Sequence, residues 1–150
     1  MTTPNKQPGL RGYVTSRPFG GLYIPVPMQS TFLRNYCAQN GYLYKLHVNE
    51  NSFAHSYLVL ESALEEIEDY AGIVCCSAFM LPASPSGRER IYQRLLDSEA
   101  SIHFVLDGNA IRSPDDVGAI ERNLRLSAEL ARAPSPDVLR QALNIPGQIS

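Results

Sequence analysis

The stretch from Gly72 to Phe79 is a nearly continuous run of apolar residues that ends at a turn. Such a run is typical of a central strand in a parallel sheet, because that strand is covered on both of its faces. Parallel strands are joined by crossover connections that are usually helices. This one segment therefore favours a fold in which strands and helices alternate along the chain.

The periodicity of the rest of the chain supplies this alternation. Strand patterns are predicted over residues 12–16, 42–48, 72–79 and 101–106, and helical patterns over residues 28–39, 56–70, 88–98 and 113–132. The order β-α-β-α-β-α-β-α predicts an α/β fold. We expect a single three-layer domain with a four-stranded, mainly parallel sheet of order 2-1-3-4, flavodoxin-like, with helices on both faces. Asn40-Gly41 supplies a left-handed end for the first helix, and Ser113-Pro114 supplies a capped start for the last.

The composition is that of an ordinary soluble globular chain. Of the 150 residues, 44% are hydrophobic and 19% are charged, which is enough apolar material for one core. We expect the folded domain over residues 10–132, a flexible N-terminus over residues 1–9, and a short helix and tail over residues 133–150.

The charge and hydropathy patterns narrow the range of partners. The formal net charge is −2 and no long run of Lys or Arg occurs, which argues against nucleic acid as a partner. The longest apolar runs are far shorter than the ~20 residues that span a bilayer. Met1 to Gly9 also lacks the apolar core of a signal peptide. We therefore expect no membrane association and a cytoplasmic location.

The cysteines and histidines indicate neither a disulfide framework nor a metal site. Cys37, Cys75 and Cys76 are few and scattered, and we expect buried thiols in a reducing compartment. The three histidines lack the spacing of metal ligands, so we expect no metal. Gly20-Gly21 has neither a GxGxxG pattern nor a Walker lysine, and we expect no nucleotide or other cofactor.

Polar side chains follow each predicted strand. Since the carboxyl ends of parallel strands meet at one edge of a sheet, these side chains should surround a single cleft. They include Thr15, Ser16 and Arg17 after the first strand, Glu50 and Asn51 after the second, Ser77 after the third, and Asp107, Asn109 and Arg112 after the fourth.

These residue types suggest acid/base chemistry on an anionic, hydroxylated ligand. Arg17 has a planar fork that binds a carboxylate or phosphate, and Glu50 or Asp107 is expected to move a proton. Thr15, Ser16, Asn51, Ser77, Arg90 and Arg112 are expected to bind the substrate. The alternatives stay open: a surface arginine paired with an acid, solvated loop carboxylates, and, for Arg90, a solvated helix face. Ser16 as a nucleophile would need a neighbouring base, and no histidine is placed beside it in the predicted fold.

Parts of the chain resemble the catalytic domain of serine recombinases. The resemblance rests on Gly12-Tyr13 at the first strand, on Gln29–Gly41, and on the strands at Gly72–Phe79 and Ser101–Leu106. It implies a resolvase-like fold. The catalytic pattern of those enzymes is not reproduced, because Ser16 lies one position out of register, so a shared reaction is not implied.

The chain more closely resembles a small family known as sporadic carbohydrate cluster proteins. The shared strings are Arg11–Phe19, Ser77–Pro82, Arg90–Gln93 and the region His103–Asp116. The resemblance implies a role in making or modifying a surface carbohydrate. The family has no established activity, so no catalytic residue can be carried over from it.

The sequence thus predicts a small cytoplasmic enzyme that acts on a sugar, a sugar phosphate or another sugar-like anionic metabolite, and that forms a homo-oligomer. The alternative is a non-catalytic subunit that binds a metabolite or another enzyme of the same carbohydrate pathway. A third hypothesis, a relict of a DNA-processing enzyme, rests on the recombinase resemblance alone.

Overall fold

A computed structural model describes residues 9–50, 53 and 55–132 of the chain. The expectations for residues 1–8 and for residues 133–150 fall outside the described residues, as does Asn51.

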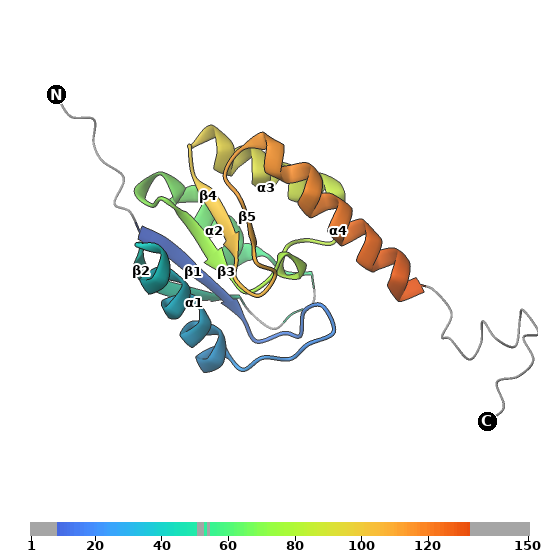
Figure 1. Cartoon of the computed structure of the whole chain (residues 1–150), viewed down its shortest axis with the longest axis horizontal. Coiled ribbons are helices and arrows are strands. Elements are labelled where there is room, and N and C mark those ends of the chain that lie inside the picture. Colours follow the sequence, from blue (N-terminus) through green and yellow to red (C-terminus); the bar gives the residue numbers. More distant parts are fainter. Residues whose placement is uncertain (1–8, 51–52, 54, 133–150) are drawn as a thin grey trace, which may run out of the picture.

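The structure is an α/β domain built on a single five-stranded sheet (Figure 1). The strands are β1 (Gly9–Thr15), β2 (Leu43–Glu50), β3 (Gly72–Cys75), β4 (Ser101–Phe104) and β5 (Asn109–Ile111). Their order is β2-β1-β3-β4-β5, and all neighbouring pairs are parallel except β4 and β5.

The prediction of a four-stranded sheet is therefore wrong in strand count and in the full strand order. The missing element is β5, which pairs antiparallel with β4 through the register Ile102 with Ile111 and Phe104 with Asn109. The turn at residues 105–108 reverses the chain, so that β5 forms the edge of the sheet next to β4.

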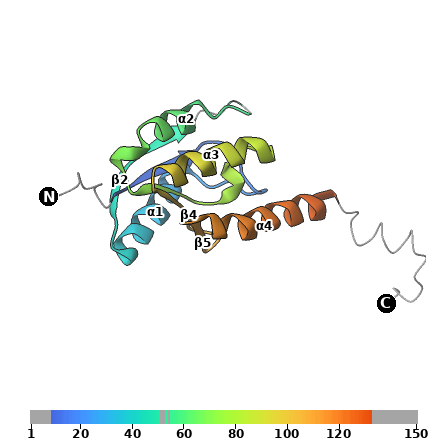
Figure 2. The same cartoon turned by 90° about the horizontal axis from the view of Figure 1, so that it is seen from above.

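Helices cover both faces of the sheet, which confirms the three-layer arrangement. Figure 2 shows α2 (Leu58–Glu65) and α3 (Pro85–Asp97) on one side, and α1 (Val26–Asn40) and α4 (Pro114–Arg132) on the other. The central strand β3 is buried over its whole length. This burial is the reason for the apolar run that begins at Gly72.

The sequence accounts for several of the element boundaries. Gly41 ends α1 with φ of 77°, as predicted from Asn40-Gly41. Ser84 caps α3, and its side chain accepts a hydrogen bond from the N–H of Gly87 at 3.1 Å. A Cβ atom at Gly72 would lie 2.0 Å from the carbonyl oxygen of Ser101, so the close approach of β3 and β4 requires glycine at this position.

Two predicted elements are shorter than expected. The predicted strand 72–79 ends at Cys75, and the chain then forms the 3-10 helix η2 (Ala78–Met80). The predicted helix 56–70 is divided into α2 and a second 3-10 helix, η1 (Ile67–Asp69).

Helix α4 extends beyond the body of the sheet (Figure 1). Because β5 carries the chain back to the amino end of the parallel strands, α4 begins at that end. Its 19 residues then run past the carboxyl ends of the strands, where α4 contacts η2.

Candidate functional site

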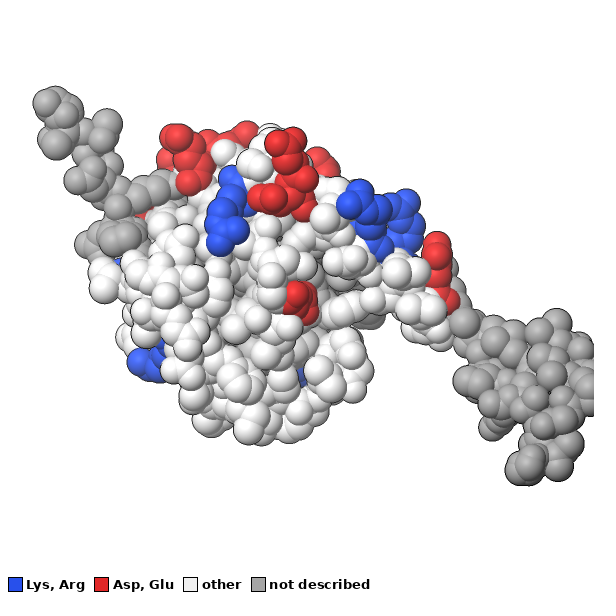
Figure 3. All heavy atoms as spheres, in the orientation of Figure 1, with Lys and Arg blue, Asp and Glu red and all other residues white. Residues whose placement is uncertain are grey.

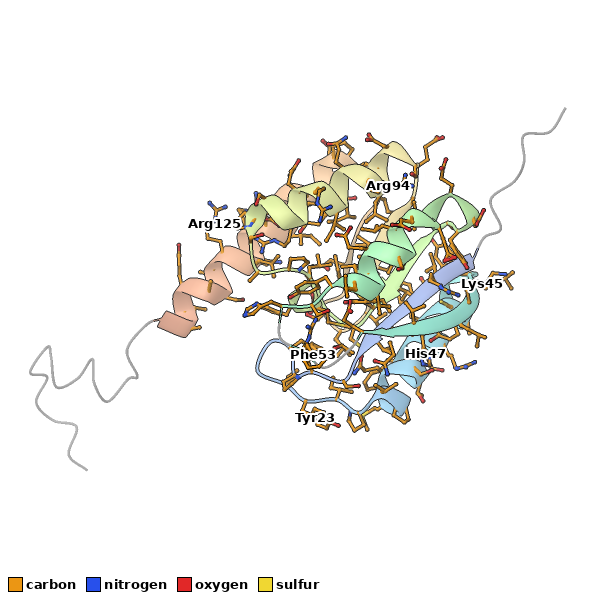
Figure 4. The ribbon with its side chains drawn as sticks, turned by 180° about the vertical axis from the view of Figure 1, so that it is seen from behind. Tyr23, Lys45, His47, Phe53, Arg94 and Arg125 are labelled. Carbon is orange, nitrogen blue, oxygen red and sulfur yellow. The ribbon has the colours of Figure 1, made fainter. Side chains whose placement is uncertain are left out.

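The segments that follow the four parallel strands gather at one end of the sheet, which we call the carboxyl edge (Figure 1). β1 and β2 end side by side there, because Thr15 is paired with Glu50. Figure 4 shows Tyr23 and Phe53 on the loops that follow these two strands, at this same end of the molecule. Open α/β sheets bind ligands outside the carboxyl ends of their strands, so this edge is the candidate site.

Thr15 at the end of β1 forms hydrogen bonds with other residues of the protein through both its side chain and its backbone. It is buried, and its Oγ1 accepts a hydrogen bond from the N–H of Arg17 at 3.1 Å. Gln29 of α1 is also buried and bonds the backbone of Thr15 twice. Its Oε1 accepts from the Thr15 N–H at 3.2 Å and its Nε2 donates to the Thr15 carbonyl at 2.7 Å. The amide of Gln29 therefore fixes the turn that carries Ser16 and Arg17.

Arg17 reaches from the turn after β1 to the loop after β2. Its Nη1 donates to the carbonyls of Phe53 at 2.6 Å and Ser56 at 2.9 Å, and its guanidinium carbon lies 4.9 Å from the centroid of the Tyr57 ring. The Nε–Nη2 side of the fork has no hydrogen-bond partner among the described residues. This side presents the two parallel N–H groups with which arginine binds a carboxylate or phosphate.

Glu50 is enclosed by its own hydrogen bonds at the end of β2, where it is only 1% exposed. Its Oε1 accepts from the Tyr13 hydroxyl at 2.8 Å and from the Leu60 N–H at 3.1 Å, and its Oε2 accepts from the Val59 N–H at 3.1 Å. Val59 and Leu60 lie in the first turn of α2, so Glu50 caps this helix from a neighbouring strand. Burial, and then the hydrogen bond to Glu50, raise the pKa of Tyr13 far above its usual value.

Asp107 is exposed in the turn after β4. Its Oδ2 accepts hydrogen bonds from the Ser77 hydroxyl at 3.2 Å and from the Ala78 N–H at 2.9 Å. The Oγ of Ser77 accepts the N–H of Phe79 at 3.1 Å and so caps η2. One oxygen of Asp107 is thus oriented, while Oδ1 has no hydrogen-bond partner among the described residues. An oriented, accessible carboxylate is suited to general acid or base catalysis.

A pocket of about 250 Å³ lies beside Asp107, between η2, the turn after β4, and α4. Its apolar walls come from Phe79, Ile120 and Leu124, and its polar groups come from Asp107, Asn109, Asn123 and Ser127. The Oδ1 atom of Asn109 is fully buried, and it has no hydrogen-bond partner in the described part of the chain. Apolar walls with a few convergent polar groups are characteristic of small-molecule sites.

The remaining predicted site residues are not all at this pocket. Ser16 is exposed in the turn after β1, and Asn51 is not among the described residues. Arg90 lies on the exposed surface of α3, where its Nη2 forms an ion pair with the Oε1 of Glu61 at 2.6 Å. For Arg90, the alternative of a solvated helix face therefore describes the structure.

The prediction that Arg112 lies at the carboxyl edge is wrong. The antiparallel strand β5 returns the chain before Arg112, which therefore lies at the amino end of the parallel strands. Arg112 there lines a larger hollow of about 600 Å³ between α3 and α4, together with the carboxylates of Glu89, Asp97 and Glu99. Within the described residues, this hollow has no buried polar side-chain atom without a partner.

The cysteines are free and buried, as predicted. Burial raises the pKa of Cys37 and of Cys76 to about 11, and the charge of Asp107 contributes at Cys76. Thiols that stay protonated at neutral pH are poor nucleophiles. Across the described ranges, no group of three or more His, Cys, Asp or Glu side chains could hold a metal ion.

The charged side chains do not form a basic surface on the face shown in Figure 3. They gather along its upper margin, over the region of α3 and along α4, and the lower part of this face carries few charges. No helix within the described ranges is long and apolar enough to cross a bilayer.

Two residues of this edge, Tyr13 and Gln29, were not identified from the sequence, whereas Asn109 was expected there after the last strand. Gln29 could have been found, because it lies four residues before Leu33 and eight before Cys37 on the buried stripe of α1. Tyr13 gave no comparable signal, since its role depends on Glu50 of β2.

Comparisons with known proteins supply no assignment. No protein-family model, no curated protein and no solved structure gives a significant match to this chain.

Proposed function

We propose that this protein is a small enzyme that acts by acid/base chemistry on a sugar or sugar-like metabolite at the carboxyl edge, with Asp107 as the proton-transferring group. The observation that carries the proposal is the state of Asp107. One of its oxygens is held by Ser77 and Ala78, and the residue is exposed beside a pocket. Sugar as the substrate class is supported by the resemblance to sporadic carbohydrate cluster proteins over Arg11–Asp116.

Arg17 is proposed as the group that binds an anionic part of the substrate. Its support is the Nε–Nη2 side of the fork, which has no hydrogen-bond partner among the described residues while Nη1 is bonded to the loop after β2. Glu50 is not included in the proposed mechanism. Its carboxylate accepts three hydrogen bonds and is buried, so proton transfer from Glu50 would uncap α2.

The second candidate function is a non-catalytic subunit that binds the same class of metabolite. One specific observation favours it: at the carboxyl edge, the second predicted carboxylate, Glu50, is enclosed. Among the described residues of this edge, Asp107 is then left without the partner acid or base that many acid/base enzymes use.

A thermal-shift screen with activity assays tests the proposal. The panel contains neutral sugars, acidic sugars, sugar phosphates and nucleotide sugars. A bound ligand raises the melting temperature by mass action. Asp107→Asn keeps the shape of the side chain and is expected to lower turnover of the stabilising sugar by about 100-fold or more. Asp69→Asn, an exposed acid in η1, is the matched control and should leave turnover unchanged.

Three other results would contradict the proposed enzymatic function or part of it. If no member of the panel stabilises the protein, the proposal fails. Equal turnover in the wild type and Asp107→Asn contradicts the role of Asp107. A sugar that stabilises the wild type but is never converted supports the binding-subunit alternative.

A further inference from the structure

We infer that Phe79 is the platform on which one uncharged pyranose ring stacks, beside the carboxylate of Asp107. This inference rests on the proposed function and deepens it, because it assigns the group that holds the sugar ring next to the proton-transferring residue. Phe79 belongs to η2 and lines the pocket of about 250 Å³ between η2, the turn after β4, and α4.

Phe79 is a large apolar side chain that the fold leaves accessible. It is 42% exposed, whereas Ala78 and Met80, its neighbours in η2, are only 4% and 3% exposed. An aromatic side chain stabilises a fold mainly through the apolar area that it removes from water, and much of that area stays uncovered here. Single exposed apolar residues are common on protein surfaces, so the surroundings of the ring decide what it can bind.

The fold holds Phe79 in place from two sides. Its N–H donates to the Oγ of Ser77 at 3.1 Å, which fixes the backbone of η2. Gly20, in the loop after β1, has φ of 57°, and a Cβ atom there would lie 3.0 Å from Cδ2 and 3.1 Å from Cγ of Phe79. A side chain at position 20 would therefore press on the ring. A ring that is held before the ligand arrives loses little conformational entropy on binding.

The backbone of η2 links the ring to the proposed catalytic carboxylate. The Oδ2 of Asp107 accepts hydrogen bonds from Ser77 and Ala78, the two residues that precede Phe79. Asp107 and Phe79 are thus bonded to the same short segment, and both line the pocket. The Oδ1 of Asp107 has no hydrogen-bond partner among the described residues. A ring stacked on Phe79 therefore shares its pocket with a carboxylate that has acceptor capacity left.

The polar groups of the lining match a neutral, hydroxylated ring. No Lys or Arg lines the pocket, so a phosphate or carboxylate beside Asp107 would be repelled and would find no cationic partner. Asp107 lies on the turn after β4, and Asn123 and Ser127 lie across the pocket on α4. A pyranose has an apolar face of C–H groups and hydroxyls around its edge that both donate and accept hydrogen bonds. It can therefore use the aromatic wall and the surrounding polar groups together.

The size of the pocket limits it to one ring. Ile120 and Leu124 of α4 complete its apolar wall, and its volume is near the lower limit of small-molecule pockets, ~300 Å³. The rest of a larger ligand would lie outside. The loop that supplies Gly20 begins with the turn of Arg17, the proposed group for an anionic part of the ligand. Phe79 therefore contacts the loop of Arg17 on one side and lines the pocket of Asp107 on the other.

Tryptophan fluorescence tests the inference directly on the full chain. The sequence contains no tryptophan, so Phe79→Trp introduces a single fluorophore at the proposed platform. The probes are methyl β-D-glucopyranoside, methyl β-D-galactopyranoside and methyl α-D-mannopyranoside. We expect at least one of them to change the emission of Phe79→Trp in a saturable manner, because a stacked sugar displaces water from the indole. Leu46→Trp, at a 72% exposed position on β2, is the matched control and should keep its emission unchanged.

Calorimetry with two further variants separates stacking from the filling of apolar volume. Phe79→Leu keeps an apolar side chain but has no ring, and it should bind the same probe about fivefold more weakly than the wild type. Phe79→Tyr keeps the ring and should bind it within about twofold of the wild type. Both variants should keep melting temperatures close to that of the wild type, because the side chain is partly exposed. A Phe79→Leu variant that binds the probe as tightly as the wild type would overturn the inference.

A nucleobase also stacks on aromatic side chains, and adenosine and uridine test for it. If a nucleoside changes the emission of Phe79→Trp while no pyranoside does, the platform takes a base and the inference is wrong. The inference also falls if no pyranoside binds the wild type at high millimolar concentration, or if a bound pyranoside leaves the emission of Phe79→Trp unchanged.

Failure of the inference differs from failure of the proposed function. If Phe79→Leu binds the pyranosides normally, the platform is wrong. The proposed enzyme then still stands wherever Asp107→Asn loses turnover of a sugar found in the thermal-shift panel. If Phe79→Leu binds weakly while Asp107→Asn keeps full turnover, the platform stands and the proposed catalytic role falls. When both are correct, Phe79→Leu should raise KM for that sugar more than it lowers kcat, and Asp107→Asn should lower kcat.

Discussion

His103 is a buried histidine whose neighbours hold it in the neutral form. It lies on β4 with no exposed surface, and its Nδ1 and Nε2 are hydrogen-bonded to the hydroxyls of Tyr36 at 2.6 Å and Ser101 at 2.8 Å. Burial, and then the positive charge of Arg112, lower the pKa of His103 from 6.5 to about 4. His103 is therefore a structural residue of the core, and it does not transfer protons at the carboxyl edge.

The first prediction concerns the pH dependence of stability. The unfolded chain binds a proton at His103 more tightly than the folded protein does. The stabilisation is therefore complete above the unfolded pKa of 6.5 and is lost as the pH falls towards the folded pKa of about 4. Urea unfolding should show a loss of about 2–3 kcal/mol between pH 7 and pH 4.5 from this group.

The variant His103→Gln isolates this effect, since its side chain does not titrate. Its free energy of unfolding should fall less steeply over the same pH range than that of the wild type. Identical slopes for the two proteins would mean that His103 does not have a depressed pKa.

The second prediction concerns Glu50 as a cap. Glu50→Gln replaces one acceptor oxygen with an N–H₂ group that faces a backbone N–H of α2. We expect its free energy of unfolding to fall by about 2 kcal/mol, measured by urea denaturation. Glu65→Gln, an exposed position on the same helix, should change it by less than about 0.5 kcal/mol. A Glu50→Gln variant that is fully stable but inactive would contradict this prediction. It would support instead the catalytic role that the sequence suggested for Glu50.

At the level of elements, two ion pairs of α3 differ in their surroundings. Arg88 is buried and forms a two-pronged contact with Glu121 of α4, Nε to Oε2 and Nη2 to Oε1, both at 2.8 Å. Its Nη1 donates to the carbonyls of Pro82 and Ala83 at 3.1 and 2.8 Å. The hydrogen bond from Arg88 also lowers the pKa of Glu121.

The third prediction compares these two pairs. Arg88→Met leaves Glu121 without its cation and frees two carbonyls, and we expect it to cost about 2–3 kcal/mol of stability. Arg90→Ala breaks an exposed pair with Glu61 and should cost less than about 1 kcal/mol. Thermal or urea unfolding of the two variants measures the difference. Equal losses would show that Arg88 does not fasten α3 to α4.

The elements also show how far the sequence alone determines the fold. The alternation of strands and helices, the parallel β1–β4 core and the Gly41 end of α1 follow from local periodicity and turn chemistry. β5 could not be predicted in this way, because Asn109-Ala110-Ile111 is too short to show a strand-like alternation of apolar and polar residues. It is a strand only through its pairing with β4. That omission displaced Arg112 by the whole length of the sheet. Gathering Thr15, Glu50, Ser77 and Asp107 at one edge required only the parallel strands, whereas the enclosure of Glu50 depended on α2.

On the scale of the whole molecule, two hollows lie at opposite ends of the sheet. The larger one, at the amino end, is lined by Glu89, Asp97, Glu99 and Arg112. The smaller one, at the carboxyl edge, is lined by the oriented Asp107, whose Oδ1 has no hydrogen-bond partner among the described residues. Polar groups that lack partners point to a ligand more directly than volume does. Homo-oligomerisation and the cytoplasmic location stay predictions from the sequence.

The most direct test of this account is a map of amide chemical shifts for the wild-type protein during titration with the sugar that stabilises it most. We predict that the largest changes fall at Ser77–Phe79 and Asp107–Asn109, with smaller ones near Arg17. Changes concentrated instead at Gln93–Asp97 and Arg112–Pro114 would place the ligand in the amino-end hollow. That result would contradict the central claim that the carboxyl edge is the functional site.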